Sequence, residues 1–300
     1  MKKRIKIMIG ILTVAVTIIS LCACGKNSGT VSDGTTNSAD GNKVILILVD
    51  GMRPDGFEGC GNSFTEELKK NSAYTLNART AFPSKTLPCH LSLFYSVSPE
   101  THGTTTNTFT PKNDNLEGLF ERLDAAQKKS CIYYNWEPLR DIAHPKAVTA
   151  AEYIRMGDVE DADSVVTEMA LDGIKKYSPD FVFVYLGKTD DVGHSFGWMS
   201  QEYLDCINDT MNDVKTIIDK TKGKYTVILT ADHGGHDKTH GFDNDEDMTI
   251  PMFVYGEKIE KGNLPEGVTI LDIAPTILDI MDVNKPEKWE GKSFAADIMK

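Results

Sequence analysis

The chain has 300 residues, of which 40% are hydrophobic and 25% charged, and this balance is that of an ordinary globular enzyme with one large domain or two small ones. Its formal net charge of -12 argues against nucleic acid polymers as partners, because binding to a phosphate backbone depends on clustered Lys and Arg, and no such cluster follows residue 6. An acidic protein that handles anionic substrates needs local positive charge, which bound metal ions commonly supply.

The first 24 residues have the features of a processing signal. A basic start, with Lys2, Lys3 and Arg4, precedes an apolar run over residues 7–21, which is shorter than the roughly 20 residues of a membrane-spanning helix but typical of a signal-peptide core. The run ends in Leu21-Cys22-Ala23-Cys24-Gly25, which resembles a bacterial lipobox and implies that Cys24 is lipidated after cleavage. We therefore expect a lipoprotein signal peptide over residues 1–24 and an extracytoplasmic protein anchored to the bacterial membrane. A plain secretory peptide is the alternative.

Residues 25–42 contain Gly, Ser, Thr, Asn and Asp with almost no apolar side chain, as is typical of a flexible tether. Since no internal repeat or second linker follows residue 42, we expect one catalytic domain over residues 43–300.

Five apolar runs in this domain are typical of strands buried on both faces. They cover residues 44–49, 131–134, 181–186, 226–229 and 252–255. Apolar residues with helical spacing occur near 116–123, 166–177, 203–218 and 273–281. Strands that alternate with helices predict an α/β fold, with a doubly wound, mainly parallel sheet flanked by helices. Ligands bind such sheets at the carboxyl ends of the strands.

Acidic and imidazole side chains follow three of these strands. In chain order they are Asp50, Asp190, His194, Asp232, His233 and His240. Carboxylate and imidazole without thiolate suit Zn²⁺ or another first-row divalent ion. Six ligands are too many for one tetrahedral site and suit two ions, which at a separation of roughly 4 Å can clamp the attacking and leaving oxygens of a displacement. The sequence therefore predicts two divalent metal ions, with Zn²⁺ favoured.

Each of these residues alone has an ordinary explanation, since an Asp after a strand commonly caps a helix or forms a turn. The ordered set is what favours metal binding. His236 lies in the same loop, and we interpret it as a supporting or solvent-facing residue. His144, between Ala143 and Pro145, is interpreted as structural.

The chain also resembles a known family. The motifs, in order, are Val49-Asp50-Gly51-Met52-Arg53-Pro54-Asp55, Phe82-Pro83-Ser84-Lys85-Thr86-Leu87-Pro88-Cys89-His90, Pro99-Glu100-Thr101-His102-Gly103, Asp190-Asp191-Val192-Gly193-His194, and Ala231-Asp232-His233-Gly234-Gly235 with His240-Gly241. From residue 43 to about residue 293 the chain is similar to the alkaline phosphatase superfamily, in its nucleotide pyrophosphatase/phosphodiesterase (type I phosphodiesterase) branch. The resemblance implies an alkaline phosphatase-like fold and a phosphoric ester hydrolase.

The resemblance also implies roles for single residues. Thr86 would be the nucleophile and would form a covalent phosphothreonine, and Asn107 would bind a non-bridging phosphoryl oxygen. One metal ion would be held by Asp50, Thr86, Asp232 and His233, and the other by Asp190, His194 and His240. Metal coordination would make the hydroxyl of Thr86, a weak nucleophile at neutral pH, more acidic.

Two departures from the superfamily's patterns bear on this interpretation. Cys89 stands where the family often has Asn, and we expect it to pack at the start of a helix. The Cys/Ser-x-Pro-x-Arg nucleophile motif of the sulfatases is absent, which argues against a sulfatase.

The substrate is less well defined by the sequence. Lys85, Phe109 and Trp136 are candidates for substrate binding, with ordinary packing as the alternative for the two aromatic residues. We expect a phosphodiesterase or nucleotide pyrophosphatase that acts on a small phosphate ester through an open site. A phosphomonoesterase on the same scaffold and a non-catalytic lipoprotein that binds a metal or ligand remain as alternatives.

Outside the signal segment the cysteines are Cys60, Cys89, Cys131 and Cys206, with no CxxC pair. A disulfide-stapled fold is therefore not expected, although one or two bridges are compatible with a compartment outside the cytoplasm.

Overall fold

The computed structural model describes residues 42–110 and 116–300. The predicted signal peptide with Cys24, and all but the last residue of the predicted tether, lie outside the described residues. Within the described ranges, no helix combines the length and the apolar character that crossing a membrane requires.

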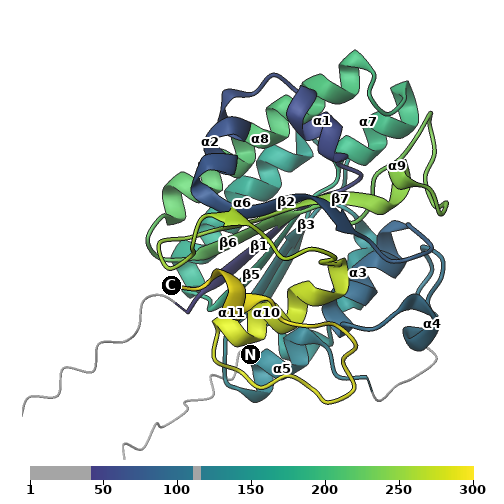
Figure 1. Ribbon diagram of the computed structural model, residues 1–300. Helices are drawn as coiled ribbons and strands as arrows, with labels where there is room; N and C mark the ends of the chain where they lie inside the picture. The colour runs from purple at the N-terminus through teal and green to yellow at the C-terminus, as the bar shows by residue number, and fades with distance from the viewer. Residues whose placement is uncertain (1–41, 111–115) are drawn as a thin grey trace, which may run out of the picture. The chain divides into compact units, whose positions relative to one another are not determined.

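An eight-stranded sheet runs through the described part of the chain, in the order β4-β3-β5-β1-β6-β7-β2-β8 (Figure 1). The strands are β1 (Val44–Val49), β2 (Ser72–Arg79), β3 (Ser130–Tyr134), β4 (Ala150–Tyr153), β5 (Phe181–Leu186), β6 (Thr226–Thr230), β7 (Thr249–Tyr255) and β8 (Gly262–Asn263). Strand β7 runs antiparallel to its neighbours β6 and β2, and the other pairings are parallel. The predicted mainly parallel sheet is confirmed.

Helices cover both faces of this sheet (Figure 1). On one face lie α1 (Pro54–Gly59), α2 (Ser63–Asn71), α6 (Ala162–Tyr177), α7 (Lys188–Phe196) and α8 (Gln201–Thr221). On the other lie α3 (Thr86–Tyr95), α4 (Pro99–His102), α5 (Leu119–Ala125), α10 (Ile273–Ile280) and α11 (Ala295–Ile298). Short elements complete the fold: α9 (Asp245–Met248), η1 (Glu137–Ile142), η2 (Pro145–Ala147) and η3 (Ile270–Asp272).

The five predicted strands are all present, and β1 and β5 have the predicted bounds. The sequence did not indicate β2, β4 and β8. Strand β2 has several half-buried residues and therefore no continuous apolar run, and β4 alternates between half-buried and exposed positions. The predicted helix near residue 116 begins only at Leu119, so that Leu116 precedes it.

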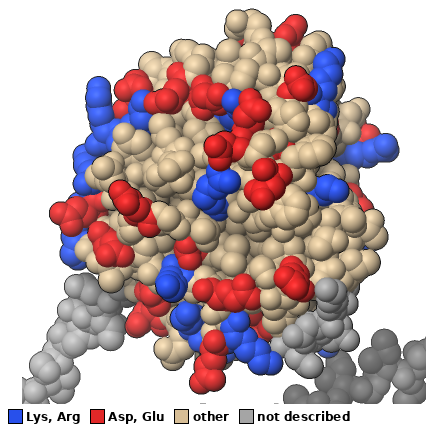
Figure 2. Space-filling model, turned by 45° about the vertical axis from the view of Figure 1, so that its right-hand side comes forward, with Lys and Arg blue, Asp and Glu red and all other residues tan. Residues whose placement is uncertain are grey.

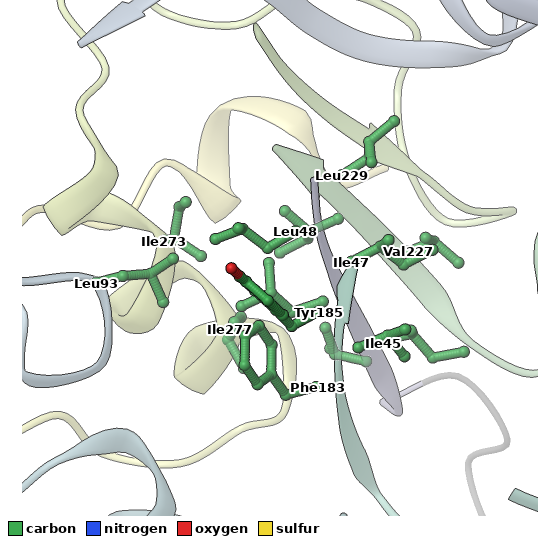
Figure 3. Close-up of a cluster of buried hydrophobic side chains, with 14 of the residues drawn as sticks. Ile45, Ile47, Leu48, Leu93, Phe183, Tyr185, Val227, Leu229, Ile273 and Ile277 are labelled. Atoms are coloured by element: carbon green, nitrogen blue, oxygen red, sulfur yellow. The ribbon is translucent and has the colours of Figure 1, made fainter. Parts of the chain in front are cut away.

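The hydrophobic core fills the space between the sheet and its helices. Figure 3 shows Phe183 and Tyr185 of β5 beside Leu93 of α3 and Ile273 and Ile277 of α10. All six residues of β1 are fully buried, and so are the residues of β5 apart from Tyr185, which is 1% exposed. Burial on both faces explains why these two strands carry unbroken apolar runs. Together they form a rigid centre from which the following loops start.

A buried polar network fixes the start of α7, the helix that follows β5. The Asn135 side chain accepts the backbone N–H of Gly187 through Oδ1 (3.1 Å) and donates through Nδ2 to Asp163 Oδ1 (2.7 Å). The same oxygen of Asp163 accepts the backbone N–H of Lys188 (3.3 Å). Burial raises the pKa of Asp163 to about 6.

We expect Asp163 to make the protein more stable in mild acid than at neutral pH. In the unfolded chain this carboxyl ionises near its usual pKa of about 3.9, so the folded protein binds more protons between about pH 4 and pH 6. This stabilisation of the folded state is on the order of 2 kcal/mol. It is fully present below about pH 4 and is lost as the pH rises through about 6. Urea unfolding at about pH 4.5 and pH 7.5 measures the difference. Asp163→Asn removes the titrating group and should reduce it, and an equal difference in the variant would contradict this assignment.

Candidate active site

The predicted acidic and imidazole residues meet at the carboxyl ends of three adjacent strands, β5, β1 and β6. Asp50 directly follows β1, and Asp232 lies two residues after the end of β6. Asp190 lies in the first turn of α7, after β5, and His194 lies one helical turn further on. Since residues four apart share a face of a helix, α7 presents both side chains together.

One group of side chains surrounds the imidazole of His233. Its Nε2 lies 3.3 Å from Asp50 Oδ1, 3.4 Å from Asp232 Oδ2 and 3.3 Å from Thr86 Oγ1. Asp50, Asp232, His233 and Thr86 are all buried. The structure thus brings together the four residues predicted to share one ion.

A second group adjoins the first. Asp190 places Oδ2 3.5 Å from His194 Nε2 and Oδ1 3.7 Å from His240 Nε2. The ligand atoms of these three residues lie within 4.8 Å of one another, as do those of Asp50, Asp190 and His233. Asp190 is shared by these two triads of ligand atoms, and the rings of His233 and His240 stack with their centroids 3.8 Å apart.

Backbone carbonyls orient the three imidazoles. His233 Nδ1 lies 2.8 Å from the carbonyl oxygen of Gly234, and His240 Nδ1 lies 2.8 Å from that of Ser84. His194 Nδ1 lies 3.0 Å from the carbonyl oxygen of Lys238. An Nδ1 that donates to a carbonyl leaves Nε2 with its lone pair free, which is the arrangement of a metal-binding histidine.

Three carboxylate oxygens at this site have no hydrogen-bond partner among the described residues. Asp50 Oδ1, Asp190 Oδ1 and Asp232 Oδ2 are buried without a hydrogen-bond partner in the protein. Burial, together with the charges of Asp232 and Asp190, raises the pKa of Asp50 well above its usual value, and burial raises that of Asp190 to about 6. Burial acts in the same direction on Asp232, but His233 and His90 outweigh it and lower its pKa. Unpaired oxygens on crowded carboxyl groups are suitable ligands for divalent cations.

Thr86 is the first residue of α3, where backbone N–H groups and the helix dipole favour an anion. Asn107 lies beside it, because its Oδ1 accepts the backbone N–H of Leu87 (3.0 Å). With this oxygen engaged, the amide nitrogen of Asn107 is the group that can donate to a phosphoryl oxygen.

The other predicted residues differ in their surroundings. Lys85 is partly buried, with its aliphatic chain close to Gly241, and Phe109 is 36% exposed. Trp136 is partly buried and packs against the hydrophobic core, which was the alternative for it. Cys89 is buried in the first turn of α3, as predicted, and burial raises its pKa. Of the two further histidines that the sequence analysis interpreted, His236 pairs with the buried Asp247 (Nδ1 to Oδ1, 2.6 Å), and His144 caps η2.

Three aromatic residues that the sequence did not single out support the site. Tyr185 of β5 donates its hydroxyl hydrogen bond to Asp50 Oδ2. Trp198 and Tyr203 both donate to the carbonyl oxygen of Gly51, at 2.9 and 2.8 Å. Gly51 has a φ of +66°, and a Cβ there would lie 3.1 Å from Asp190 Oδ1, so the close approach of α7 requires glycine.

His90 is a further buried residue beside the site. Its Nδ1 lies 2.7 Å from the carbonyl oxygen of Thr86 and 3.7 Å from Asp232 Oδ2. The sequence analysis gave His90 no role, although it is the last residue of the motif from Phe82 to His90. Its place in that motif is the sequence signal that could have identified it as a residue beside the site.

Comparisons with known proteins identify relatives of this chain. A family model described as type I phosphodiesterase / nucleotide pyrophosphatase matches residues 44–249. Ectonucleotide pyrophosphatase/phosphodiesterase family member 1 of Rattus norvegicus is 25% identical over 218 residues, which is 64% of this chain and 24% of the relative. A venom phosphodiesterase of Crotalus durissus collilineatus is 22% identical over 309 residues, covering 90% of this chain and 36% of the relative. The chain thus spans about a quarter to a third of the length of these relatives.

Solved structures show the same fold. An inactive variant of murine ectonucleotide pyrophosphatase/phosphodiesterase 5 in complex with AMP aligns with a TM-score of 0.72 at 15% identity, covering 86% of this chain and 100% of that chain. A 2-O GAG sulfatase aligns with a TM-score of 0.66 at 13% identity, and the alignment covers 86% of this chain and 74% of the sulfatase chain. The sheet and its flanking helices therefore have the alkaline phosphatase-like fold.

Proposed function

The chain belongs to the type I phosphodiesterase / nucleotide pyrophosphatase family, and from this premise we propose that it is a metal-dependent phosphodiesterase or nucleotide pyrophosphatase with Thr86 as its nucleophile. The observation that carries the proposal is the position of Thr86 Oγ1, 3.3 Å from His233 Nε2 and inside a cluster of buried carboxylates. A side chain that served packing alone would have no need of such neighbours.

Two divalent ions, with Zn²⁺ favoured, complete the proposed site. Asp50, Thr86, Asp232 and His233 would hold one, and Asp190, His194 and His240 the other. The unpaired carboxylate oxygens and the oriented imidazoles fit such ions. Bound divalent cations supply the positive charge that lowers the pKa of a hydroxyl and stabilises a leaving oxygen.

In the proposed first step, Thr86 Oγ1 forms a bond to phosphorus while the bond from phosphorus to the leaving oxygen breaks. The hydroxyl proton passes to water, and the leaving group departs as an alcohol after taking a proton from water. The N-terminus of α3 and the amide nitrogen of Asn107 stabilise negative charge on the non-bridging oxygens.

In the second step, a water oxygen attacks phosphorus and the bond between phosphorus and Thr86 Oγ1 breaks. This step restores the hydroxyl of Thr86 and releases a phosphomonoester. The two displacements exchange one ester oxygen for one water oxygen, so the sum is hydrolysis.

We expect the purified protein to hydrolyse bis-p-nitrophenyl phosphate at least about tenfold faster than p-nitrophenyl phosphate. The family model that matches this chain is that of type I phosphodiesterases and nucleotide pyrophosphatases, and its relatives include an ectonucleotide pyrophosphatase/phosphodiesterase and a venom phosphodiesterase, which supports a diester as the preferred substrate. Release of p-nitrophenolate from both esters, measured on one metal-loaded sample, tests this. A preference for the monoester would replace the diesterase with a phosphomonoesterase, and turnover of neither would favour a binding protein.

We also propose that the protein is lipidated at Cys24 and held on the outer side of a bacterial membrane. Support comes from the basic start of the chain and the apolar run over residues 7–21, which precede this cysteine. Expression of the full chain with Cys24→Ser should move the protein from the detergent phase to the aqueous phase in a Triton X-114 partition. If the wild-type protein is found in the aqueous phase, the anchor is wrong.

A further inference from the structure

A hollow lined by lysines lies at the end of the sheet away from the candidate active site. It has a volume of about 650 Å³, and we name it the basic hollow after its four lysines: Lys43, Lys175, Lys220 and Lys224. Lys43 directly precedes β1 and Lys224 lies two residues before β6, whereas the candidate site lies where these parallel strands end. A strand of the length of β1 spans about 20 Å, which separates the two places. In Figure 1 the purple start of β1 lies at the lower left, and α3 and α7 lie at the right.

Contacts between separate segments fix the frame of the basic hollow. The carbonyl oxygen of Lys43 accepts the backbone N–H of Thr226 (2.8 Å), which joins the starts of β1 and β6. The hydroxyl of Tyr225, the residue after Lys224, donates to the carbonyl oxygen of Pro179 (2.7 Å), which joins β6 to the segment between α6 and β5. The ammonium group of Lys43 lies 5.8 Å from the centre of the Tyr225 ring. The lysines are therefore carried by rigid parts of the fold.

The basic hollow has a surplus of positive charge. Lys69, Lys188 and Lys215 each pair with a carboxylate, but within the part of the chain that the structure describes no ion pair involves the lysines of the hollow. One carboxylate, that of Asp172, lines the hollow beside the four lysines. Figure 2 shows a different pattern on the face that it brings forward, where Lys and Arg lie among Asp and Glu. In a chain with a net charge of -12, this local surplus indicates an anionic partner.

Helix stability explains two of these lysines but not the other two. Lys175 and Lys220 lie in the last turns of α6 and α8, where the helix dipole favours a cation. Lys43 and Lys224 precede strands and stabilise no helix end. The gathering of all four around one hollow therefore needs another reason.

We propose that the basic hollow binds the headgroups of anionic phospholipids in the membrane to which Cys24 anchors the chain. This inference rests on the proposed lipid anchor and adds a second contact with the same membrane. Lys43 is the first residue after the predicted tether over residues 25–42, so the hollow is the part of the domain that lies nearest to the anchor along the chain. A chain of that length reaches at most about 65 Å, which keeps this end of the domain close to the bilayer.

Apolar side chains favour a lipid over a free inorganic anion. Leu171, Ile174 and Tyr225 line the hollow beside the lysines. A phospholipid presents its phosphate next to glycerol and methylene groups, and these contact apolar surface while lysine side chains reach the phosphate. A free phosphate ion has no use for such surface.

Binding in this way would direct the candidate active site away from the bilayer. The screening length is about 10 Å at 0.1 M salt, so the carboxylates at the other end of β1, about 20 Å away, weaken the attraction little. The lipid then holds the domain upright, with the carboxyl ends of β1, β5 and β6 facing the aqueous side.

Sedimentation with lipid vesicles tests the basic hollow. The chain is expressed from residue 25 on, so that it keeps the whole described domain and carries no lipid. We expect it to sediment with vesicles of equal parts phosphatidylcholine and phosphatidylglycerol in about 0.1 M NaCl, and to stay in solution with phosphatidylcholine alone. Lys220→Gln combined with Lys224→Gln should lower the partition coefficient about 25-fold, since each lysine near an anionic surface contributes about fivefold.

Lys288→Gln combined with Lys292→Gln is the matched control. Both lysines are exposed, and the pair of substitutions removes the same charge. Glu290, between them, donates its backbone N–H to the carbonyl oxygen of Ser96 at the end of α3, on the other face of the sheet. The partition coefficient of this variant should stay within about twofold of the wild type, because its charges lie beyond the screening length from the hollow. Urea unfolding of both variants should match the wild type.

Three outcomes would overturn the proposal. The first is a chain that fails to sediment with the anionic vesicles, or sediments equally with phosphatidylcholine alone. The second is an equal loss in the two double variants, which would assign the binding to net charge. The third is a melting temperature that inorganic phosphate raises in the wild type but not in the Lys220 and Lys224 double variant, without vesicle binding, which would make the hollow a site for a free anion.

The lipid anchor is judged by a separate measurement. The vesicle assay uses a chain without lipid, so its result does not depend on Cys24. A Triton X-114 partition that contradicts the anchor, together with vesicle binding that depends on Lys220 and Lys224, would remove the tether from the proposal and keep the hollow as the membrane contact. Loss of vesicle binding with a sound anchor would overturn the hollow alone.

Discussion

Replacement of Thr86 with alanine is expected to lower phosphodiester turnover by at least about 10⁴-fold, because no other hydroxyl can take the place of a lost nucleophile. Thr86 Oγ1 is the hydroxyl that lies beside His233 Nε2 at the start of α3. Release of p-nitrophenolate from bis-p-nitrophenyl phosphate measures the loss.

Two further measurements separate chemistry from structural damage. Thr86→Ser keeps the hydroxyl and should retain activity within about a hundredfold of the wild type. Metal content of Thr86→Ala should remain close to that of the wild type, since Asp50, Asp232 and His233 are unchanged. Mass spectrometry of acid-quenched wild-type enzyme should find a phosphoryl group on Thr86. Activity above about a tenth of the wild type in Thr86→Ala would exclude this residue as the nucleophile.

Removal of the metal ions with a strong chelator should abolish hydrolysis, and added Zn²⁺ should restore it. Without cations, the burial of Asp50 and Asp190 opposes their ionisation, as their raised pKa values indicate. Binding at about a thousandfold above the dissociation constant adds about 4 kcal/mol to the stability of the folded state. For a domain of this size that corresponds to a rise of about 8–16 °C in the melting temperature. Calorimetry and metal analysis before and after chelation measure both effects.

A pair of neighbouring carboxylates provides the control for metal binding. Asp190 is proposed to hold the second ion together with His194 and His240, so Asp190→Asn should lower the metal content at that position and reduce turnover by about a thousandfold or more. Asp191 is the next residue, but its side chain is exposed and outside both groups, so Asp191→Asn should keep its metal. Equal metal content in the two variants would contradict the assignment of Asp190.

The centre of the fold and the candidate ligands could be predicted from the sequence because both leave local signals. Strands β1 and β5 are buried on both faces and therefore read as unbroken apolar runs, and the Asp and His residues follow them within a few positions. Since parallel strands end at one edge, residue type and position after the strand were enough to predict that Asp50, Asp190 and Asp232 meet.

Other features could not be predicted, for physical reasons. An apolar run does not show in which direction its strand runs in the sheet. Only the structure could therefore show that β7 is antiparallel to its neighbours. Helix α7 was missed because Lys188–Phe196 has little apolar periodicity, its buried face being occupied by Thr189 and Gly193. Tyr185 lies in a strand where any aromatic residue looks like core, and only its contact with Asp50 identifies it as a support of the site.

The cysteines bear on how the protein can be handled. Cys60, Cys89, Cys131 and Cys206 are all free and buried, and burial raises the pKa of Cys206 to about 12. The described fold therefore requires no thiol oxidation, and a chain without its signal segment should reach the same fold in the reducing cytoplasm of an expression host. Dithiothreitol should leave the protein scaffold intact, and any inhibition by this reagent would report its binding to the proposed metal ions rather than the rupture of a crosslink.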